Sequence, residues 1–335
     1  MARVARWAAG YIARVANPFT RLIAKLDAYQ RQHAWLGFPI AVAKKFGDDD
    51  AGKQAALIAY YGFFSLFPLM LVMVTILGFL LGHNSKLQND IVNSVFARFP
   101  FIGDQIRNNV GSLHGSGIAL AVGIVGALWG GMRVVQAAQG AMDTVWHVPR
   151  KKRPNFVTSR LRALVLLLVL GAGIIGTTVL TGLATAGTGH SLATKIIAVA
   201  ISTLINFGVF LAAFYLLTVA DVSWKQLVPG AVVAALAGVV LQALGGYIVG
   251  HTFKGASQTY GTLAAVIAML SWIYLQAQVT LFAAEVNTVR VMKLWPRGLV
   301  ADRPTEADER VLKGLAETEE RKPDEDVDVQ FRRVS

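Results

Sequence analysis

Long apolar segments dominate the chain, and their lengths predict membrane helices. Six windows consist mostly of apolar residues: 54–82, 115–132, 163–187, 196–220, 226–250 and 260–289. A membrane helix needs about 20 such residues to cross roughly 30 Å of hydrocarbon. The first window is the plainest, because no charged residue occurs between Gln54 and Ser85. The pattern predicts an all-α, polytopic membrane protein with six transmembrane helices.

Lysine and arginine are divided unevenly between the two sides of these six predicted spans. The N-terminal segment, the links at 133–162 and near Lys225, and the C-terminal segment together hold 27 of them, and the other three links hold 5. Basic residues concentrate on the cytoplasmic side of membrane proteins. Both termini are therefore predicted to lie in the cytoplasm.

Amphipathic segments flank the predicted spans. Residues 86–115 place Leu87, Ile91 and Val95 at helical spacing, and the first 26 residues interleave arginines with apolar side chains. Both patterns predict helices in the membrane interface, and packing against the protein's own bundle is the alternative.

Charge divides the chain into three regions. The net charge is +12, but the residues from 298 onward include seven basic and eleven acidic ones. We therefore expect a basic, amphipathic cytoplasmic region at 1–53, a six-helix membrane domain at 54–290 and a mostly disordered acidic cytoplasmic tail at 291–335. An acidic segment with few large apolar residues buries too little surface to fold alone.

Two prolines interrupt predicted spans. In AYYGFFSLFPL at 59–69, Pro68 leaves the carbonyl of Phe64 without its helical partner, and Tyr61 and Ser65 share the face of Pro68. In lipid such a carbonyl must be satisfied, so this face should lie against protein, with Ser65 as a candidate partner. Pro229 repeats the situation in a helix expected to begin at Trp224. A structural kink and a moving gate both stay open for each proline.

Polar residues form stripes on two spans. Arg133, Gln136 and Asp143 share a face near the end of the second, and Tyr274, Gln278 and Glu285 share a face of the sixth. Ionisable residues at membrane depth usually mark a pathway or a buried pair, although these could also reach the headgroups. An ion pair between Glu285 and Arg133 is the first candidate. The predicted pathway or gate residues are Tyr61, Ser65, Pro68, Arg133, Gln136, Asp143, Pro229, Tyr274, Gln278 and Glu285.

Composition changes this picture mainly through exclusions. Hydrophobic residues make up 54% of the chain, and mean hydropathy is +0.50. Cysteine is absent, the six histidines lack ligand spacing, and nucleotide-loop and hydrolase motifs are missing. We expect no catalytic residues, cofactor or metal. The basic run Arg150, Lys151, Lys152 and Arg153 is expected to contact anionic lipid headgroups rather than nucleic acid.

Several stretches resemble the YihY/BrkB family of bacterial inner-membrane proteins. The resemblance is carried by FGDDDAGKQAALIAYYGFFSLFPLMLV, by LW at 128–129 with DTVWHV, by WKQLVPGAVVAAL and by YGTLAAVIAMLSWIYLQAQVTLFAAEVN. The resemblance covers about residues 45–290, and these stretches are similar to the YhjD-like branch of the family. One departure is Ala283, where many members carry a glycine. The family pattern carries over to Tyr60, Tyr61, Ser65, Pro68, Trp129, Pro229, Gly230, Tyr260, Gly261, Trp272 and Glu285.

The resemblance implies six membrane helices and an envelope-related role in the bacterial inner membrane. The family was formerly labelled ribonuclease BN, but the sequence lacks the acid-base or metal cluster that RNA hydrolysis needs, so we do not expect an enzyme. Our leading hypothesis is movement of a lipid or amphiphilic envelope component. An ion-coupled small-solute transporter and a non-transporting envelope scaffold are the alternatives, with membrane lipids, a second copy or an envelope protein as partners.

Overall fold

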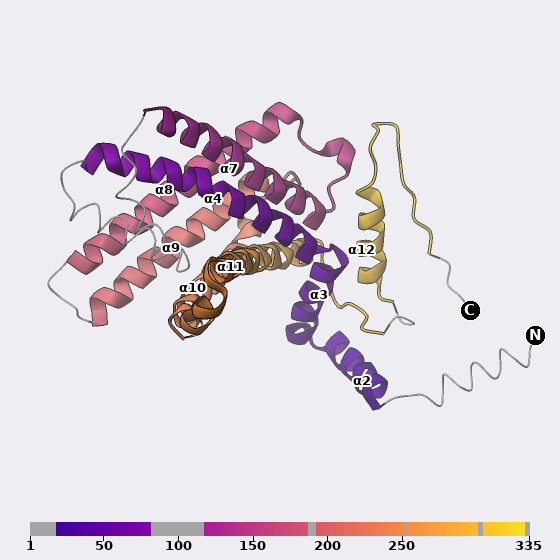
Figure 1. The fold of residues 1–335 in the computed structure, drawn as a ribbon. Helices are drawn as coiled ribbons and strands as arrows, with labels where there is room; N and C mark the ends of the chain where they lie inside the picture. Colours follow the sequence, from indigo (N-terminus) through magenta and orange to yellow (C-terminus); the bar gives the residue numbers. More distant parts are fainter. Residues whose placement is uncertain (1–17, 82–116, 187–191, 252, 301–303, 332–335) are drawn as a thin grey trace, which may run out of the picture.

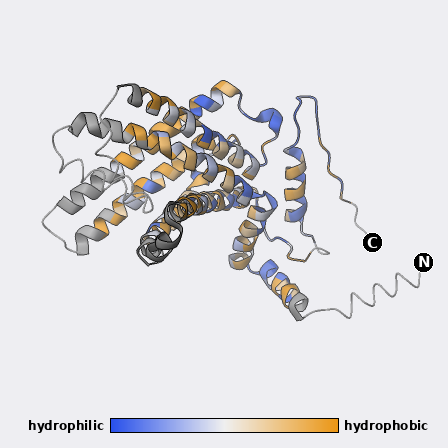
Figure 2. Cartoon of the chain, viewed as in Figure 1, coloured by the Kyte–Doolittle hydropathy of each residue, from blue (hydrophilic) through white to orange (hydrophobic). Residues whose placement is uncertain are grey.

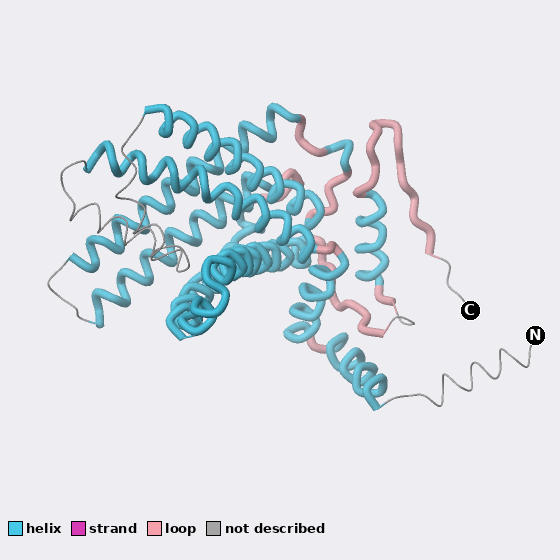
Figure 3. Tube along the Cα trace, in the orientation of Figure 1, coloured by secondary structure: helices cyan, strands magenta, loops and turns pink. Residues whose placement is uncertain are grey.

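The computed structural model describes residues 18–81, 117–186, 192–251, 253–300 and 304–331 (Figure 1). Helices are the only regular elements in these ranges, which contain no strand (Figure 3). The all-α fold is confirmed for this part of the chain. The amphipathic helices expected at 86–115 and before residue 18 lie outside the described residues, and so does the side chain of Tyr260.

Six long helices and several short ones make up the described chain. The long helices are α4 (Ala51–Leu81), α7 (Gly117–Val145), α8 (Phe156–Ala186), α9 (Leu192–Leu217), α10 (Trp224–His251) and α11 (Phe253–Val291). The short ones are α2 (Pro18–Gln32), α3 (Ala34–Asp48), the 3₁₀ turn η2 (Arg150–Lys152) and α12 (Glu306–Glu317). Helix α10 begins at Trp224 as predicted, because the Ser223 backbone N–H donates to Gln226 Oε1 at 2.9 Å.

Five helices contain described stretches that are long and apolar enough to cross a membrane: Ala121–Val145, Phe156–Gly176, Val199–Leu217, Trp224–Gly245 and Val266–Val291. They correspond to the second to sixth predicted spans. Helix α4 coincides with the first, and its crossing stays a prediction, as does the cytoplasmic location of the termini. The prediction ended the second span too early at residue 132, because α7 continues to Val145, with Gln139 and Asp143 buried against neighbouring elements.

The six long helices pack in a closed cycle (Figure 1). Going round it, α4 contacts α7, α7 contacts α8, and the sequence continues through α9 and α10 to α11, which contacts α4 again. The first residues of α4, α8 and α10 and the last residues of α7, α9 and α11 lie at one end. We call this the terminus-bearing end, because α3, which precedes the long helices in the chain, contacts α11 and α4 there.

Among the side chains that the structure describes, burial is concentrated at the terminus-bearing end. The largest buried cluster joins the last turns of α7 and α9 to the first turns of α8 and α10, with Trp146, Phe214 and Leu227 among its members. Hydrophilic residues also gather at this end (Figure 2). The bundle is therefore closed by packed side chains at the terminus-bearing end.

Glycines on α7 allow α4 to pack closely through its proline. A Cβ at Gly126 would lie 3.0 Å from Pro68 Cβ, and one at Gly130 would lie 2.9 Å from Ser65 Cβ. The face of Ser65 and Pro68 lies against protein, as the sequence predicted. Ser65 Oγ donates to the carbonyl of Gly62 at 2.8 Å, however, and not to that of Phe64.

Helices α10 and α11 meet at Gly230. A Cβ there would lie 2.3 Å from the carbonyl oxygen of Ala283 and 2.4 Å from Asn287 Nδ2. The Gly230 N–H donates to Asn287 Oδ1 at 2.7 Å. Gly230, one residue after Pro229, is therefore the small residue that lets α10 approach α11 closely. Ala283 of α11 is fully buried at this contact.

The expectation of a mostly disordered acidic tail is wrong for residues 304–331. Helix α12 starts with a capping box, in which Thr305 and Asp308 each bond to the other's backbone N–H. Val311 of α12 is fully buried in a cluster with Ala41, Val42 and Val289. Composition alone failed here because the surface that buries α12 comes from α3 and α11.

The α10–α11 contact predicts unequal effects of two identical substitutions. Gly230→Ala should lower the free energy of unfolding by about 1–3 kcal/mol, because a backbone carbonyl blocks the added methyl group. Gly208→Ala on α9 meets nothing within 4 Å, and should stabilise its helix by about 0.5–1 kcal/mol. Thermal unfolding of the detergent-purified variants measures both, and equal melting temperatures would contradict this contact.

Candidate functional site

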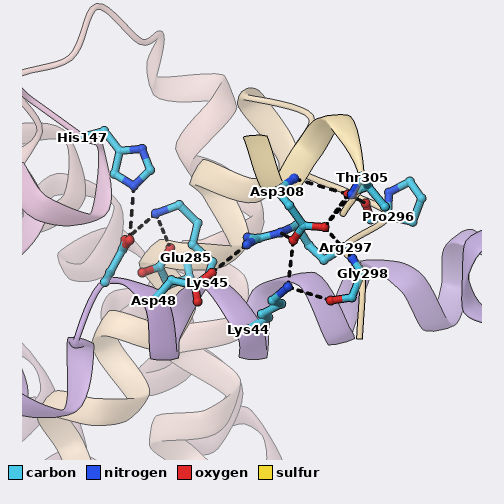
Figure 4. Close-up of polar contacts among 11 residues, drawn as sticks. Lys44, Lys45, Asp48, His147, Glu285, Pro296, Arg297, Gly298, Thr305 and Asp308 are labelled. Carbon is cyan, nitrogen blue, oxygen red and sulfur yellow. Dashed lines mark hydrogen bonds and ion pairs between the residues drawn. The ribbon is translucent and has the colours of Figure 1, made fainter. Parts of the chain in front are cut away.

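A fully buried lysine forms the centre of the candidate site. Lys45, near the end of α3, has no exposed side-chain surface. Its Nζ contacts Asp49 Oδ2, donates to the carbonyl of Val145 at 2.8 Å and lies 3.1 Å from Glu285 Oε2 (Figure 4). One ammonium group therefore connects α3, the end of α7 and the membrane helix α11.

Asp49 and His147 complete the buried charge cluster, which we define as Lys45, Asp49, His147 and Glu285. His147 Nε2 donates to Asp49 Oδ1 at 3.2 Å. Burial alone would raise the pKa of Asp49, but the hydrogen bond from His147 and the charge of Lys45 hold this pKa below its ordinary value. Asp49 is therefore an anion in the folded protein.

Local sequence explains how these groups reach one place. Lys45 and Asp49 are four residues apart across the last turn of α3, so their side chains lie on one face. His147 follows α7 with a positive φ of 50°, which turns the chain directly after the helix. Glu285 is on the face of α11 that α3 covers. Each charge is positioned by the end of a helix or by a helix face.

A second ionic contact holds the C-terminal segment against α3. Arg297 is 2% exposed, and its guanidinium bonds Asp308 and Asp48, each at 2.7 Å. Lys44 Nζ donates to Asp308 Oδ1 at 2.8 Å and to the Gly298 carbonyl (Figure 4). Burial would raise the pKa of Asp308, but the bonds from Lys44 and Arg297 hold it well below its ordinary value. Neighbouring lysines on α3 thus serve two different clusters.

The C-terminal helix also covers the buried charge cluster. A Cβ at Gly314 of α12 would lie 2.2 Å from His147 Nδ1. The histidine therefore has Asp49 on one side and α12 on the other. The tail, which the sequence analysis left outside the site, forms part of its wall.

The polar stripes have partners other than those expected. The candidate pair of Glu285 with Arg133 is wrong: Glu285 lies beside Lys45, and the Arg133 guanidinium lies 5.3 Å from the centre of the Trp129 ring. The predicted pair was wrong because residue spacing along one helix does not reveal which other helix packs against its polar face. Asp143 is buried 3.7 Å from Arg153 Nε.

The remaining predicted residues lie on several faces of the bundle. Gln278 Nε2 donates to the Tyr274 hydroxyl at 3.0 Å. Tyr61 and Gln136 are half-buried on α4 and α7, and Pro68 and Pro229 lie at the helix contacts already described. Of the ten predicted residues, only Glu285 belongs to the buried charge cluster.

Sequence reasoning missed Lys45, Asp49, His147 and Arg297. Lys45 and Asp49 had a visible signal. They are a lysine and an aspartate four residues apart at the end of an amphipathic segment, directly before the first apolar span. His147 and Arg297 had none, since they meet the cluster residues only through long-range contacts. The described residues contain no group of three or more His, Asp or Glu side chains placed to hold a metal ion.

The basic run at 150–153 lies against the acidic tail. Arg150 Nη2 bonds Glu319 at 3.1 Å, and Lys151 Nζ pairs with Glu320 at 2.9 Å. The backbone N–H of Lys151 also donates to the Glu320 carbonyl at 2.9 Å. These basic side chains therefore have protein partners, and their expected contact with anionic headgroups stays a prediction.

Long apolar helices in a closed cycle, with a buried charge cluster at one end, define a polytopic helical membrane protein. A family model described as Virulence factor BrkB matches residues 42–298, so the chain belongs to this family. The resemblance noted in the sequence is thereby confirmed. All four residues of the buried charge cluster lie inside the matched range.

Individual relatives are similar over most of their length. The chain is 22% identical to the inner membrane protein YhjD of Escherichia coli (strain K12), covering 81% of this chain and 86% of that protein. It is 25% identical to a UPF0761 membrane protein of Vibrio vulnificus (strain YJ016), covering 78% and 85%. A Bacillus subtilis (strain 168) protein whose name calls it ribonuclease-like, YfkH, is 24% identical over 71% and 89%. No solved structure matches the chain. The protein is an inner-membrane protein of this family.

Removing the central charge should destabilise the fold strongly. Lys45→Met leaves Asp49 and Glu285 buried without their cation, which typically costs about 3–5 kcal/mol. Lys53→Met is the matched control, because its partner Asp50 and Lys53 itself are exposed, and its effect should stay within about 1 kcal/mol. Thermal unfolding of both variants gives the comparison.

A double substitution separates charge from packing. Adding Glu285→Gln to Lys45→Met removes one uncompensated carboxylate and should recover part of the lost melting temperature. A double variant less stable than Lys45→Met alone would show that Glu285 is not paired with Lys45 through its charge.

The second ionic contact predicts release of the tail. Asp308→Asn should raise hydrogen exchange across residues 304–318, and Asp324→Asn, at an exposed site, should not. Because the folded pKa of Asp308 lies below the ordinary value of 3.8, its stabilisation is complete above that pH and is lost as the pH falls below it. Wild-type tail protection that stays constant from pH 6 to well below that value would contradict this.

Proposed function

We propose that this protein moves, or helps to move, a lipid or another amphiphilic envelope component across the inner membrane. The observation that carries the proposal is the buried charge cluster at the closed end of the helix cycle. Buried ion pairs are often no more stabilising than well-packed apolar residues, so a cluster of this kind is poorly explained by stability alone. Ionisable residues in membrane helices commonly belong to transport sites.

An amphiphile needs an apolar surface for its chains and a polar place for its headgroup. Helices α8 and α9 supply the first, because large apolar side chains such as Leu168 and Leu204 are 74% and 66% exposed. Polar groups collect at the terminus-bearing end, which supplies the second. This division favours a lipid-like cargo over a water-soluble one.

Movement requires the closed end to open. We assign the hinge role to Pro68 and Pro229, since each removes one helical hydrogen bond next to a close helix contact. Tyr61 and Ser65 share the face of Pro68 and form the adjoining part of this gate. The basic run at 150–153 would then contact anionic headgroups when the acidic tail separates from it.

An ion-coupled transporter for a small solute is the second candidate. Glu285 is fully buried, and its Oε2 lies 3.1 Å from Lys45 Nζ. A buried carboxylate that faces both an ammonium and the carboxylate of Asp49 is suited to exchange a proton. This candidate predicts transport that collapses with the ion gradient and needs no particular lipid.

A lipid-movement assay in reconstituted vesicles tests the proposal. Wild-type protein should move fluorescent phospholipid between leaflets, and Glu285→Gln and Pro68→Ala should each slow movement about tenfold, equivalent to roughly 1.4 kcal/mol in the barrier. Glu317→Gln, at an exposed ion pair on α12, is the matched control and should act as wild type. The proposal fails if wild type moves no lipid and cells lacking the protein have unaltered envelope lipids.

A further inference from the structure

A half-open cleft lies at the terminus-bearing end, apart from the buried charge cluster. It encloses about 350 Å³ between the start of α8, the end of α9 and the link to α10. Ligand pockets commonly measure about 300–1,000 Å³, so this cleft suits a small group rather than a whole lipid. Its polar lining residues are Arg162, Tyr215, Thr218 and Asp221. None of the buried charge cluster residues lines it.

The cleft presents one positive and one negative side chain from different elements. Arg162 belongs to α8, and Asp221 belongs to the link between α9 and α10. Among the described residues neither forms an ion pair, with the other or elsewhere, within 4.0 Å. Arg162 Nη1 and Thr218 Oγ1 are buried without hydrogen-bond partners there. The nearby carboxylate of Asp143 lies 3.7 Å from Arg153 Nε and also experiences the charge of Arg162.

The cleft adjoins the lipid-facing surface. On α8, Leu161 directly before Arg162 and Leu168 six residues after it are 62% and 74% exposed. Tyr215 of α9 is 57% exposed and lines the cleft itself. Tyrosine commonly lies at the membrane interface, where headgroups meet acyl chains. A lipid with its headgroup in the cleft could therefore keep its chains along α8 and α9.

We propose that this cleft binds a phosphoethanolamine headgroup, with its phosphate on Arg162 and its ammonium on Asp221. A phosphate accepts charge-assisted hydrogen bonds from a guanidinium, and a carboxylate accepts them from a primary ammonium. A headgroup with only negative charge meets repulsion from Asp221, and a purely cationic one meets repulsion from Arg162. The inference rests on the proposed function and names the class of amphiphile.

Binding of defined lipids to the full chain tests the assignment. Native mass spectrometry of the detergent-purified protein compares phosphatidylethanolamine with phosphatidylglycerol, which carries the phosphate without the ammonium. Wild type should bind phosphatidylethanolamine about tenfold more tightly, the effect of one charge-assisted hydrogen bond. Glycerophosphoethanolamine and inorganic phosphate, added as competitors, distinguish a lipid site from a site for a soluble phosphate compound.

Single substitutions test which residue binds the phosphate and which binds the ammonium of the headgroup. Arg162→Gln should weaken binding of both lipids about tenfold. Asp221→Asn should abolish the preference for phosphatidylethanolamine while phosphatidylglycerol binding is kept or improved. Arg160→Gln is the matched control, because this arginine lies over the Phe156 ring, 3.8 Å from its centre, and does not line the cleft. Unchanged melting temperatures show that each variant is folded.

Several outcomes would overturn the inference. Equal binding of the two lipids by wild type, equal effects of Arg162→Gln and Arg160→Gln, or full competition by inorganic phosphate would each contradict it. The vesicle assay separates this failure from failure of the proposed function. If lipid movement is unchanged by substitution of Arg162 and Asp221, only the headgroup-binding inference is contradicted. If the protein binds phosphatidylethanolamine selectively but moves no lipid, only the transport proposal is contradicted.

Discussion

The contact between the Lys45 ammonium and its buried acceptors is the constraint on which the closed end of this protein depends. An ammonium without water needs anions and carbonyl groups around it, and here they come from α3, the end of α7 and α11. Satisfying one lysine therefore fixes three elements relative to one another. The same requirement explains why α3, a short helix outside the membrane helices, packs against them.

Close helix packing supplies the rest of the bundle's order. Without a hydrophobic driving force between helices in lipid, small residues let backbones approach and increase van der Waals contact. Gly126 and Gly130 do this opposite Pro68 and Ser65, and Gly230 does it opposite Ala283. Both prolines thus lie beside contacts that are tight in the closed bundle. An opening motion at either proline would have to separate these surfaces.

Charge at the terminus-bearing end is arranged in layers. The buried charge cluster lies against the membrane helices, the Arg297 contact joins α3 to the C-terminal segment, and the acidic tail lies along the basic run. Exposure increases outward, so screening by salt and water increases too. The outer pairs are therefore weakened by salt more than the inner cluster.

The sequence by itself determined the helical class, the long apolar spans and the start of α10, because these depend on local apolar runs and on a local capping contact. It also placed the Pro68 face against protein, since a freed carbonyl cannot face lipid. It could not identify the partner of Glu285, which spacing assigned to Arg133 and the fold assigns to Lys45. It also treated the tail as disordered, although residues of α3 and α11 bury α12. Only the tertiary structure decided these pairings, because Glu285 meets Lys45, more than 200 positions earlier in the chain, and no local pattern records that approach.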